Sequence, residues 1–467
     1  MLARFRGNPA TRSDRKTILF YGHYDVIAAE NQQGKWIVDP FNMEGIDGYL
    51  YGRGASDNKG PIMAAIYAVA ELIAEQGLES DIVFLIEGEE ECGSRGFKDV
   101  IKRYKDTIGE VDWILLANSY WLDDFNPCLT YGLRGVIHAS VQIESRHPDL
   151  HSGVDGSALL DESLKDLVML LSRLTGTHGS VQLPGFYDPI PPLTDEEEQH
   201  YADITHTLLE RNPSLGSPQS LAESLKRRWR EATLTIHRFT TSGPENSTII
   251  PRMARAAISL RLVPHQRAEK VAEDLTNFLR SEFKKLGSQN ELAVHIDLQA
   301  DPWLGDYTNA MYKTLEKAIM DVWGPYHQRR RSSAPLIRPL STDGATDNTN
   351  GKHRPATSSD LATISTASEH GSDSEETETG SANIDGQADY RTSPMDAPKM
   401  RKPLYIREGG SIPAIRFLEK EFGAPAAQLP CGQASDSAHL DNERLRLVNL
   451  YKSKEIFKRV FRELPRK

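Results

Sequence analysis

Cysteine is scarce in this chain, and its placement excludes two kinds of stabilised site. The 467 residues contain three cysteines, Cys92, Cys128 and Cys431, which lie far apart in the sequence. Three separated cysteines form neither a disulfide framework nor a Cys-x-x-Cys zinc site. Because few, unpaired cysteines are typical of a reducing compartment, we expect a cytoplasmic protein.

Long apolar runs and an excess of basic residues are also missing. No run of about 18 consecutive apolar residues occurs, so the sequence predicts no membrane span. Lys and Arg number 55 against 66 Asp and Glu, and the net charge of -11 disfavours binding to nucleic acids or anionic membranes. The hydrophobic fraction of 39% is still enough for a buried core.

Apolar runs that alternate with a helical pattern predict an α/β domain. Residues 17–21, 81–86 and 112–117 are continuously apolar, as buried strands of a parallel sheet are. Between the first two, residues 61–77 have the apolar spacing of a helix, with Pro61 in its first turn. This order indicates a mostly parallel sheet with helices on both faces.

The pattern changes after Gly135. Three stretches alternate apolar and polar residues, as half-buried antiparallel strands do: 135–145, 233–239 and 254–263. Helical spacing follows at 268–283 and returns at 308–323 and 443–463. We therefore expect an α+β domain at 136–299, inserted into a discontinuous α/β domain formed by 1–135 and 300–467.

Residues 328–400 differ in composition from the rest. They open with three arginines, Arg329 to Arg331, and continue in Ser, Thr, Asp, Glu and Gly with almost no large apolar residues. Such a segment buries too little surface to offset its ordering entropy, so we expect a disordered low-complexity insert. A solvated insertion is the simpler interpretation, and a phosphorylated or partner-binding insert is the alternative.

Polar residues follow the predicted strands of the α/β domain. His23 and Asp25 follow the first strand, the acidic run 87–91 follows the second, and Asn118 follows the third. In open α/β sheets, ligands bind beyond the carboxyl ends of the strands. Asp57 in a Gly-rich loop and His439 near the C-terminus extend this set, and imidazoles with carboxylates suit Zn²⁺ or Mn²⁺.

Ten motifs occur in an order that resembles a known peptidase family. They are YGHYDV (21–26), WIVDPF (36–41), YGRGASDNKGP (51–61), EGEEECGS (87–94), TYGLRG (130–135), DLHSG (149–153), STIIP (247–251), SLRLVP (259–264), REGGSIP (407–413) and PCGQASDSAH (430–439). The set resembles the zinc peptidases that include cytosolic nonspecific dipeptidase, carnosinase, aminoacylase and carboxypeptidase G. Several motifs are most similar to the fungal glutathione-degradation members, which work with a glutamine-amidotransferase-like partner.

The resemblance implies a site for two divalent metal ions, Zn²⁺ or alternatively Mn²⁺. His23 would bind one metal, Asp57 would bridge both, and Glu91 and His439 would bind the second. The dipeptidases have an Asp ligand after the third strand, where this chain has Asn118. An amide offers only a neutral oxygen, so we expect one of the two positions to bind its metal ion more weakly. Replacement of that ligand by the nearby Asp123 or Asp124 is speculative.

The resemblance also implies roles around the metals. Asp25 would orient His23, and Glu90 would act as the general base on the attacking water. The inserted domain would be a lid and dimerisation domain whose strands around 254–262 pair across a two-fold axis. It would deliver His151 to the partner subunit's site to stabilise the oxyanion.

Three further residues would contact the substrate by the same resemblance. Thr248 and Arg261 belong to the lid, and a guanidinium suits a terminal carboxylate because it donates two parallel hydrogen bonds. Ser411 would bind the same end of the substrate, and it is equally well placed to cap the helix that follows.

These residues leave three functions open. The first is a metallopeptidase that hydrolyses small peptides with a free C-terminal carboxylate, within a glutathione-degrading complex. The second is a noncatalytic scaffold for an amidotransferase-like subunit. The third is a stand-alone dipeptidase or N-acyl amino acid hydrolase. Asn118 and the insert at 328–400 favour the first two, and the otherwise complete set of site residues favours catalysis.

Overall fold

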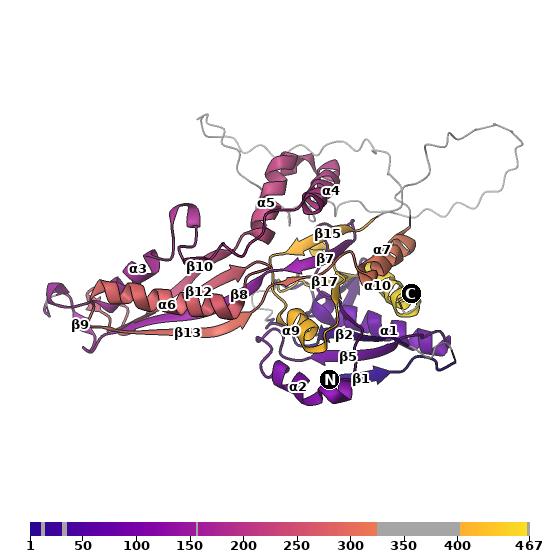
Figure 1. Cartoon of the computed structure of the whole chain (residues 1–467), viewed down its shortest axis with the longest axis horizontal. Coiled ribbons are helices and arrows are strands. Elements are labelled where there is room, and N and C mark those ends of the chain that lie inside the picture. Colours follow the sequence, from indigo (N-terminus) through magenta and orange to yellow (C-terminus); the bar gives the residue numbers. More distant parts are fainter. Residues whose placement is uncertain (11–14, 30–34, 156, 325–401, 465–467) are drawn as a thin grey trace, which may run out of the picture.

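The structure, a computed structural model, describes residues 1–10, 15–29, 35–155, 157–324 and 402–464. The insert expected at 328–400 lies outside the described residues. The molecule is elongated, with a body of sheet and helices at one end and a long arm at the other (Figure 1). Among the described helices, none combines the length and apolar composition needed to cross a lipid bilayer.

The body is built on a sheet that holds eight strands within the described residues, in the order β1-β5-β2-β6-β16-β7-β14, with β15 also paired to β7. Their bounds are β1 Leu2–Phe5, β2 Thr17–His23, β5 Asp81–Glu87, β6 Trp113–Leu116, β7 Cys128–Leu133, β14 Trp303–Leu304, β15 Leu404–Glu408 and β16 Ala426–Gln428. Strands β5, β2, β6 and β16 run parallel, so the predicted mostly parallel sheet is confirmed.

Helices cover both faces of this sheet. They are α1 Gly60–Ala74, α2 Phe97–Ile108, α7 Ala310–Trp323, α9 Pro413–Phe422 and α10 Leu447–Glu463. Phe20 and Tyr21 are consecutive on β2 and point to opposite sides, where they meet Phe457 of α10 and Phe97 of α2. Because both faces of β2 are buried, its sequence is continuously apolar.

Two sequence expectations for the helices need correction. Residues 443–463, whose spacing predicts one helix, form a short strand, β17 Arg444–Arg446, followed by α10. Leu445 is buried because β17 pairs with β4 Tyr49–Tyr51, in a small sheet with β3 Glu44–Ile46. The apolar spacing of residues 61–77 predicts a helix face that ends at Ile73, but in α1 Leu72 is buried and Ile73 is 46% exposed.

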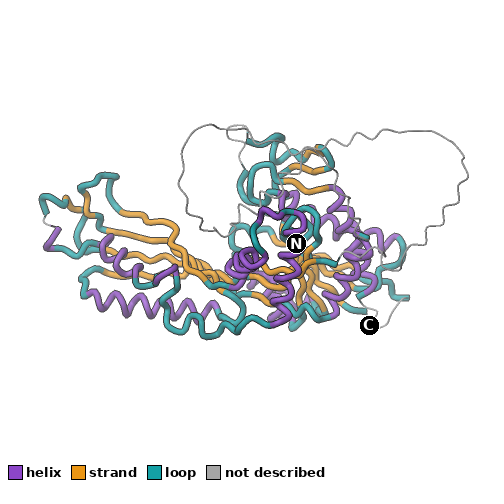
Figure 2. The backbone as a smooth tube through the Cα atoms, turned by 90° about the horizontal axis from the view of Figure 1, so that it is seen from above, coloured by secondary structure: helices purple, strands orange, loops and turns teal. Residues whose placement is uncertain are grey.

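The arm is an antiparallel sheet in the order β10-β12-β8-β13, with α3 Ser163–Ser172 and α6 Ala268–Leu286 against one face (Figures 1 and 2). Its strands are β8 Gly135–Glu144, β10 Thr233–Thr241, β12 Met253–Leu262 and β13 Glu291–Ala300. At the far end, β9 Leu150–His151 pairs with β11 Ile249–Ile250. The arm corresponds to the predicted lid.

The strand expected to pair across a dimer axis is an inner strand. β12, which contains residues 254–262, is hydrogen-bonded to β10 on one side and to β8 on the other. It therefore has no free edge, and that expectation is wrong. Within the residues that the structure describes, the outer strand β10 pairs only with β12, and residues 237–241 are exposed.

Two helices inside the range 136–299 pack on the body. They are α4 Asp195–Arg211 and α5 Pro218–Arg230, and they lie above β15 in Figure 1. Tyr201 of α4 and Leu225 of α5 share a buried cluster with Cys128 and Ile406 of the body sheet. The chain thus crosses from the arm to the body and back between α3 and β10.

Candidate active site

The carboxyl ends of three adjacent parallel strands carry the predicted site residues. β2 ends at His23, β5 is followed by the acidic loop with Glu90 and Glu91, and β6 is followed by Asn118. The order β5-β2-β6 brings these ends to one edge of the sheet. Asp57 comes from the irregular helical segment η2 Ala55–Lys59, which precedes α1.

Four of the predicted metal ligands meet at this edge. His23 Nε2 lies 3.1 Å from Asp57 Oδ1, and His439 Nε2 lies 3.2 Å from Asp57 Oδ2. His439 Nε2 is also 2.8 Å from Glu91 Oε1. One donor atom each from His23, Asp57 and Glu91 lies within 4.8 Å of the others. Asp57 therefore directs one oxygen to each imidazole, as a carboxylate shared by two cations would.

The electrostatics of the cluster favour positive charge. Burial lowers the pKa of His23, but its hydrogen bond to Asp57 and the Asp57 charge outweigh this and raise the pKa to about 9. Hydrogen bonds to Asp57 and Glu91 raise the pKa of His439 to about 10. Burial raises the pKa of Asp57, yet its hydrogen bonds with the two imidazoles bring it well below its usual value. Such a carboxylate set stabilises cations, whether protons or metal ions.

Glu90 lies beside the cluster as a separate carboxylate. Its side chain is half-buried. Burial, opposed by His23 and reinforced by Glu91 and Asp57, raises its pKa to about 7. A carboxylate with such a pKa is suited to exchange a proton near neutral pH.

Two acidic residues hold the loops that carry the ligands. Asp25 accepts a hydrogen bond from the Glu91 backbone N–H at 3.0 Å, and its Oδ1 lies 3.5 Å from His23 Nδ1. Glu443 is buried and accepts from the backbone N–H groups of Gly54, Ser56 and Asp57. Both residues therefore fix ligand positions without facing the cluster as ligands themselves.

Asn118 is adjacent to the cluster but does not direct an oxygen into it. Its Oδ1 accepts from the Ser119 backbone N–H at 2.5 Å, and its Nδ2 lies 3.4 Å from His23 Nε2. Asp123 and Asp124 do not replace it. Asp123 accepts from backbone and side-chain groups of its own turn, and Asp124 accepts from the Ser435 N–H.

The predicted substrate residues separate into two groups. His151 lies on β9, and Thr248 directly precedes β11, at the end of the arm that Figure 1 shows remote from the body sheet. Arg261 and Ser411 lie where the arm joins the body, with Arg261 Nη1 donating to Ser411 Oγ at 3.1 Å. Ser411 donates to the Arg134 carbonyl at 2.6 Å and makes no capping bond to α9.

Comparisons with known proteins agree with this geometry. The pattern of peptidase family M20/M25/M40 matches residues 19–344. The probable di- and tripeptidase DUG2 of Saccharomyces cerevisiae is 37% identical over 99% of this chain and 44% of its own length. The Cys-Gly metallodipeptidase DUG1 of Candida albicans is 31% identical over 96% of this chain and 78% of its own. The solved structure of the dipeptidase Dug1p of Saccharomyces cerevisiae has a TM-score of 0.70 at 26% identity, over 100% of this chain and 82% of that one.

The chain belongs to peptidase family M20/M25/M40. It spans less than half the length of the curated DUG2 relative that it matches. In this M20 chain, the parallel sheet, the arm and the order of the motifs agree with the family expected from the sequence.

The metal implied by the M20 family fits the residues that are present. Two imidazoles and two carboxylates converge, and the shared carboxylate Asp57 has a depressed pKa. Nitrogen and carboxylate ligands suit Zn²⁺ and Mn²⁺. Asn118 does not contribute a ligand oxygen in this arrangement, so the side of the cluster at His23 has fewer charged ligands than the side at Glu91.

Sequence reasoning missed three supporting residues of the M20 site. Glu443 holds the Asp57 loop, and Asn58 accepts from the His23 N–H and donates to the Ala117 carbonyl. Glu408 lies next to the cluster and accepts from the hydroxyls of Ser119 and Thr130. Asn58 and Glu408 sit inside recognised Gly-containing motifs, which was the available signal, whereas Glu443 lies four residues beyond the last motif.

Proposed function

We propose that this chain hydrolyses the amide bond of small peptides with the help of two divalent metal ions, with Zn²⁺ as the preferred metal. The observation that carries the proposal is the convergence of His23, Asp57, Glu91 and His439 at one sheet edge, with Glu90 beside them. When bound, the metal ions supply Lewis-acid polarisation of the scissile carbonyl.

The chain's own residues then supply proton transfer and orientation. Glu90 takes the proton of the attacking water and passes it to the leaving amine, a role its pKa near 7 supports. Asp25 keeps His23 and the Glu91 loop in position. Arg261 and Ser411, which are hydrogen-bonded to each other, bind the C-terminal carboxylate of the substrate.

We further propose a role in the breakdown of glutathione, as part of a complex with a glutamine-amidotransferase-like partner in the cytoplasm. The support is the resemblance of the motifs together with relatives named as a di- and tripeptidase and as Cys-Gly metallodipeptidases. The three cysteines, which are free thiols, agree with a reducing compartment.

A homodimer through the arm completes this proposal. β10 is an outer strand of the described arm sheet, so its edge away from β12 offers backbone groups to a second copy. His151 is exposed and far from its own cluster, so we propose that it stabilises the oxyanion in the partner's site, with Thr248 beside the substrate.

Asn118 supports one alternative function. If the side at His23 holds metal too weakly, the chain serves as a noncatalytic scaffold for its partner. A stand-alone dipeptidase or N-acyl amino acid hydrolase is the remaining alternative, and it would use the same cluster without a partner.

The test is hydrolysis of Cys-Gly, glutathione and simple dipeptides by the purified chain with added Zn²⁺ or Mn²⁺. Activity that requires both metal and the partner supports the complex, and activity with metal alone supports the stand-alone enzyme. No hydrolysis under any of these conditions contradicts the proposed enzyme and leaves the scaffold.

A further inference from the structure

Helices α3 and α6 cover one face of the arm sheet, and the opposite face carries polar side chains. Ile137 and Ala139 of β8 belong to the buried cluster beneath these helices. Because side chains alternate along a strand, His138 points to the opposite face, which we call the open face. His138 lies across from Ser259 on β12, and Arg261 follows two positions later on the same strand. His138, Ser259 and Arg261 therefore share the open face.

The open face reaches the loop that carries Glu91. On the other neighbour of β8, Leu298 of β13 lies across from His138. A Cβ atom placed on Gly93 would lie 3.8 Å from Leu298 Cδ1, and Gly93 is two residues beyond Glu91. His138 is therefore on the strand between Arg261, at the proposed carboxylate site, and the residue that approaches the loop of Glu91.

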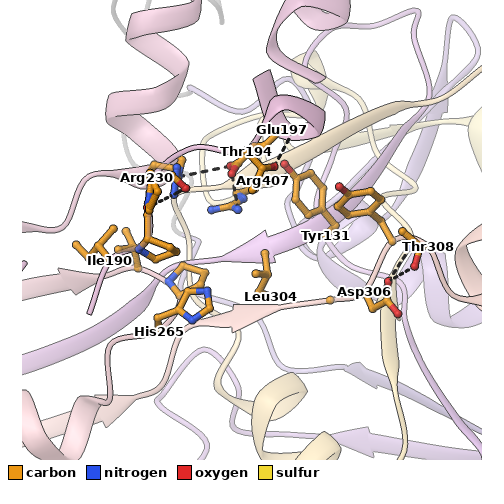
Figure 3. Close-up of a pocket in the computed structure, with 16 residues that line it drawn as sticks. Tyr131, Ile190, Thr194, Glu197, Arg230, His265, Leu304, Asp306, Thr308 and Arg407 are labelled. Carbon is orange, nitrogen blue, oxygen red and sulfur yellow. Dashed lines mark hydrogen bonds and ion pairs between the residues drawn. The ribbon is translucent and has the colours of Figure 1, made fainter. Parts of the chain in front are cut away.

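Arg261 differs from the guanidiniums of a pocket where the arm meets the body. In that pocket, which has a volume of 330 Å³, Arg230 and Arg407 share the carboxylate of Glu197, with N–O distances of 3.6 Å and 2.9 Å (Figure 3). Arg261 donates instead to the Ser411 hydroxyl, and no carboxylate of the described residues forms an ion pair with it. Since a buried charge is costly unless it is paired, Arg261 leaves positive charge for an anionic ligand.

Two imidazoles and a hydroxyl adjoin Arg261 on the open face. His237 Nε2, from β10, lies 2.8 Å from Ser259 Oγ. Burial, Arg261 and His237 lower the pKa of His138. Both of these side chains therefore lie close enough to act on the charge of His138, and the three strands β10, β12 and β8 bring their polar groups to one place.

One carboxylate, Asp297, also acts on His138 and raises its pKa. Asp297 Oδ2 accepts from Ser140 Oγ at 2.6 Å, and Arg255 Nη2 donates to the same hydroxyl at 2.6 Å. Ser140 is two residues beyond His138 on β8, in the direction away from Arg261. The carboxylate of Asp297 is therefore held on the side of His138 away from Arg261, and the space beside Arg261 keeps its positive charge.

This placement matches a substrate whose C-terminal residue is Asp or Glu. As proposed above, Arg261 and Ser411 bind the C-terminal carboxylate. Arg261 and Ser259 are two residues apart on one strand, a spacing of about 6–7 Å. The side chain of the same substrate residue can span this spacing to meet Ser259 and the two imidazoles. Imidazole and hydroxyl hydrogens in the positive field of Arg261 suit an acidic side chain, because hydrogen bonds to a charged acceptor are the stronger ones.

We propose that His138, His237 and Ser259 bind the side chain of the substrate's C-terminal residue and favour an acidic side chain there. The three groups donate hydrogen bonds to the side-chain carboxylate while Arg261 holds the C-terminal one. This inference rests on the proposed peptidase function, because it names the substrate class that the same site prefers.

Two dipeptides that differ in one charge test the inference. Ala-Glu and Ala-Gln have the same shape, and only Ala-Glu has a side-chain carboxylate. Binding is measured by calorimetry with the full chain in Zn²⁺, carrying Glu90→Gln to prevent turnover. We expect Ala-Glu to bind at least about 10-fold more tightly than Ala-Gln, as a charge-assisted hydrogen bond predicts.

Histidines on the same face give a matched pair of variants. His138→Leu should remove the preference for Ala-Glu, and His138→Lys, which keeps a cationic donor, should retain it. His295→Leu is the control, because His295 is exposed on the same face, across from Ser140 and further from Arg261. Equal affinity for the two dipeptides, no binding of Ala-Glu, or a preference that survives His138→Leu overturns the assignment. Loss of the preference in His295→Leu as fully as in His138→Leu also overturns it.

The outcomes separate this inference from the proposed function. If the Glu90→Gln chain prefers Ala-Glu but the unmodified chain hydrolyses no peptide, the assignment of the open face stands and the proposed function fails. If the unmodified chain hydrolyses both dipeptides but the Glu90→Gln chain binds them equally, the assignment of the open face fails alone.

Discussion

The metal cluster and the tip of the arm carry residues of one proposed reaction. They differ in whether a single chain brings the reacting residues together. In the cluster, His23 is fully buried and Asp57 bonds to two imidazoles. At the tip, His151 is exposed, and its ring accepts from the N–H of Gly153 in its own loop. The comparison teaches that one chain brings the candidate metal ligands together by itself, whereas His151, which we propose to stabilise the oxyanion, lies far from them.

The largest effect is expected inside the cluster. Glu90→Gln should lower turnover by about 10²–10⁴-fold, because the amide accepts no proton from water. Metal content, measured by mass spectrometry, should not change, since Glu90 is not among the four converging ligands. Glu89→Gln is the matched control, because Glu89 is exposed and pairs with the exposed Arg95. Near-native activity of Glu90→Gln would remove Glu90 as the base.

The next effect tests the tip. His151→Ala should lower turnover by about 10²–10³-fold, as removal of an oxyanion donor does. His147→Ala, another exposed histidine of the arm, should have little effect. A mixture of Glu90→Gln and His151→Ala chains should regain activity, because one of the two sites in a mixed dimer has both groups intact. Failure of the mixture to recover, or an active monomer in light scattering, would break the proposed sharing.

The third prediction concerns the incomplete side of the cluster. Asn118→Asp should raise metal affinity at the His23 side by about 10–100-fold, because it supplies a charged oxygen in place of an amide. Titration of the unmodified chain should show two unequal metal affinities, and the variant should bring them closer together. Asn42→Asp, at an exposed position of the body, serves as a control that adds the same charge. Two equal affinities before and after substitution would show that position 118 is not a defective ligand.

The smallest effect concerns the buried carboxyl beside the cluster. Burial raises the pKa of Glu408 from 4.5 to about 7, with Asp57 raising and Arg228 lowering it. The folded state therefore keeps a proton that the unfolded chain loses. The stability linked to this group is fully present below pH 4.5 and is lost as pH rises through about 7.

Denaturant unfolding of the metal-free chain at pH 4.5 and 8 measures this loss. The free energy of unfolding of the unmodified chain should fall between these two pH values. In Glu408→Gln this fall should be smaller by about 1–3 kcal/mol. Glu245→Gln, at an exposed position near the arm tip, should keep the unmodified pH dependence. If Glu408→Gln has the same pH dependence of stability as the unmodified chain, Glu408 has its ordinary pKa in the folded state.

Much of the body and the cluster could be predicted from the sequence. β2, β5 and β6 have both faces buried, so their apolar runs were unambiguous. The polar residues that follow these strands could be placed together because parallel strands share one edge, whereas the choice of Glu91 as a ligand came from the resemblance to the family. Other features depend on packing that no local pattern encodes. Helices α4 and α5 pack on the body because Tyr201 and Leu225 join a buried apolar cluster there. The orientation of Asn118 depends on a hydrogen bond to the backbone of the next residue.

The bond between Glu443 and the Asp57 loop has a consequence for biosynthesis. The two residues are 386 positions apart, so 386 residues must be added after Asp57 before Glu443 is part of the chain. Domains fold from the N-terminus as they emerge, but this loop lacks its buried acceptor until the segment that contains Glu443 has emerged. A transcript that ends before codon 443 would therefore yield a protein with most of its core and no competent metal centre.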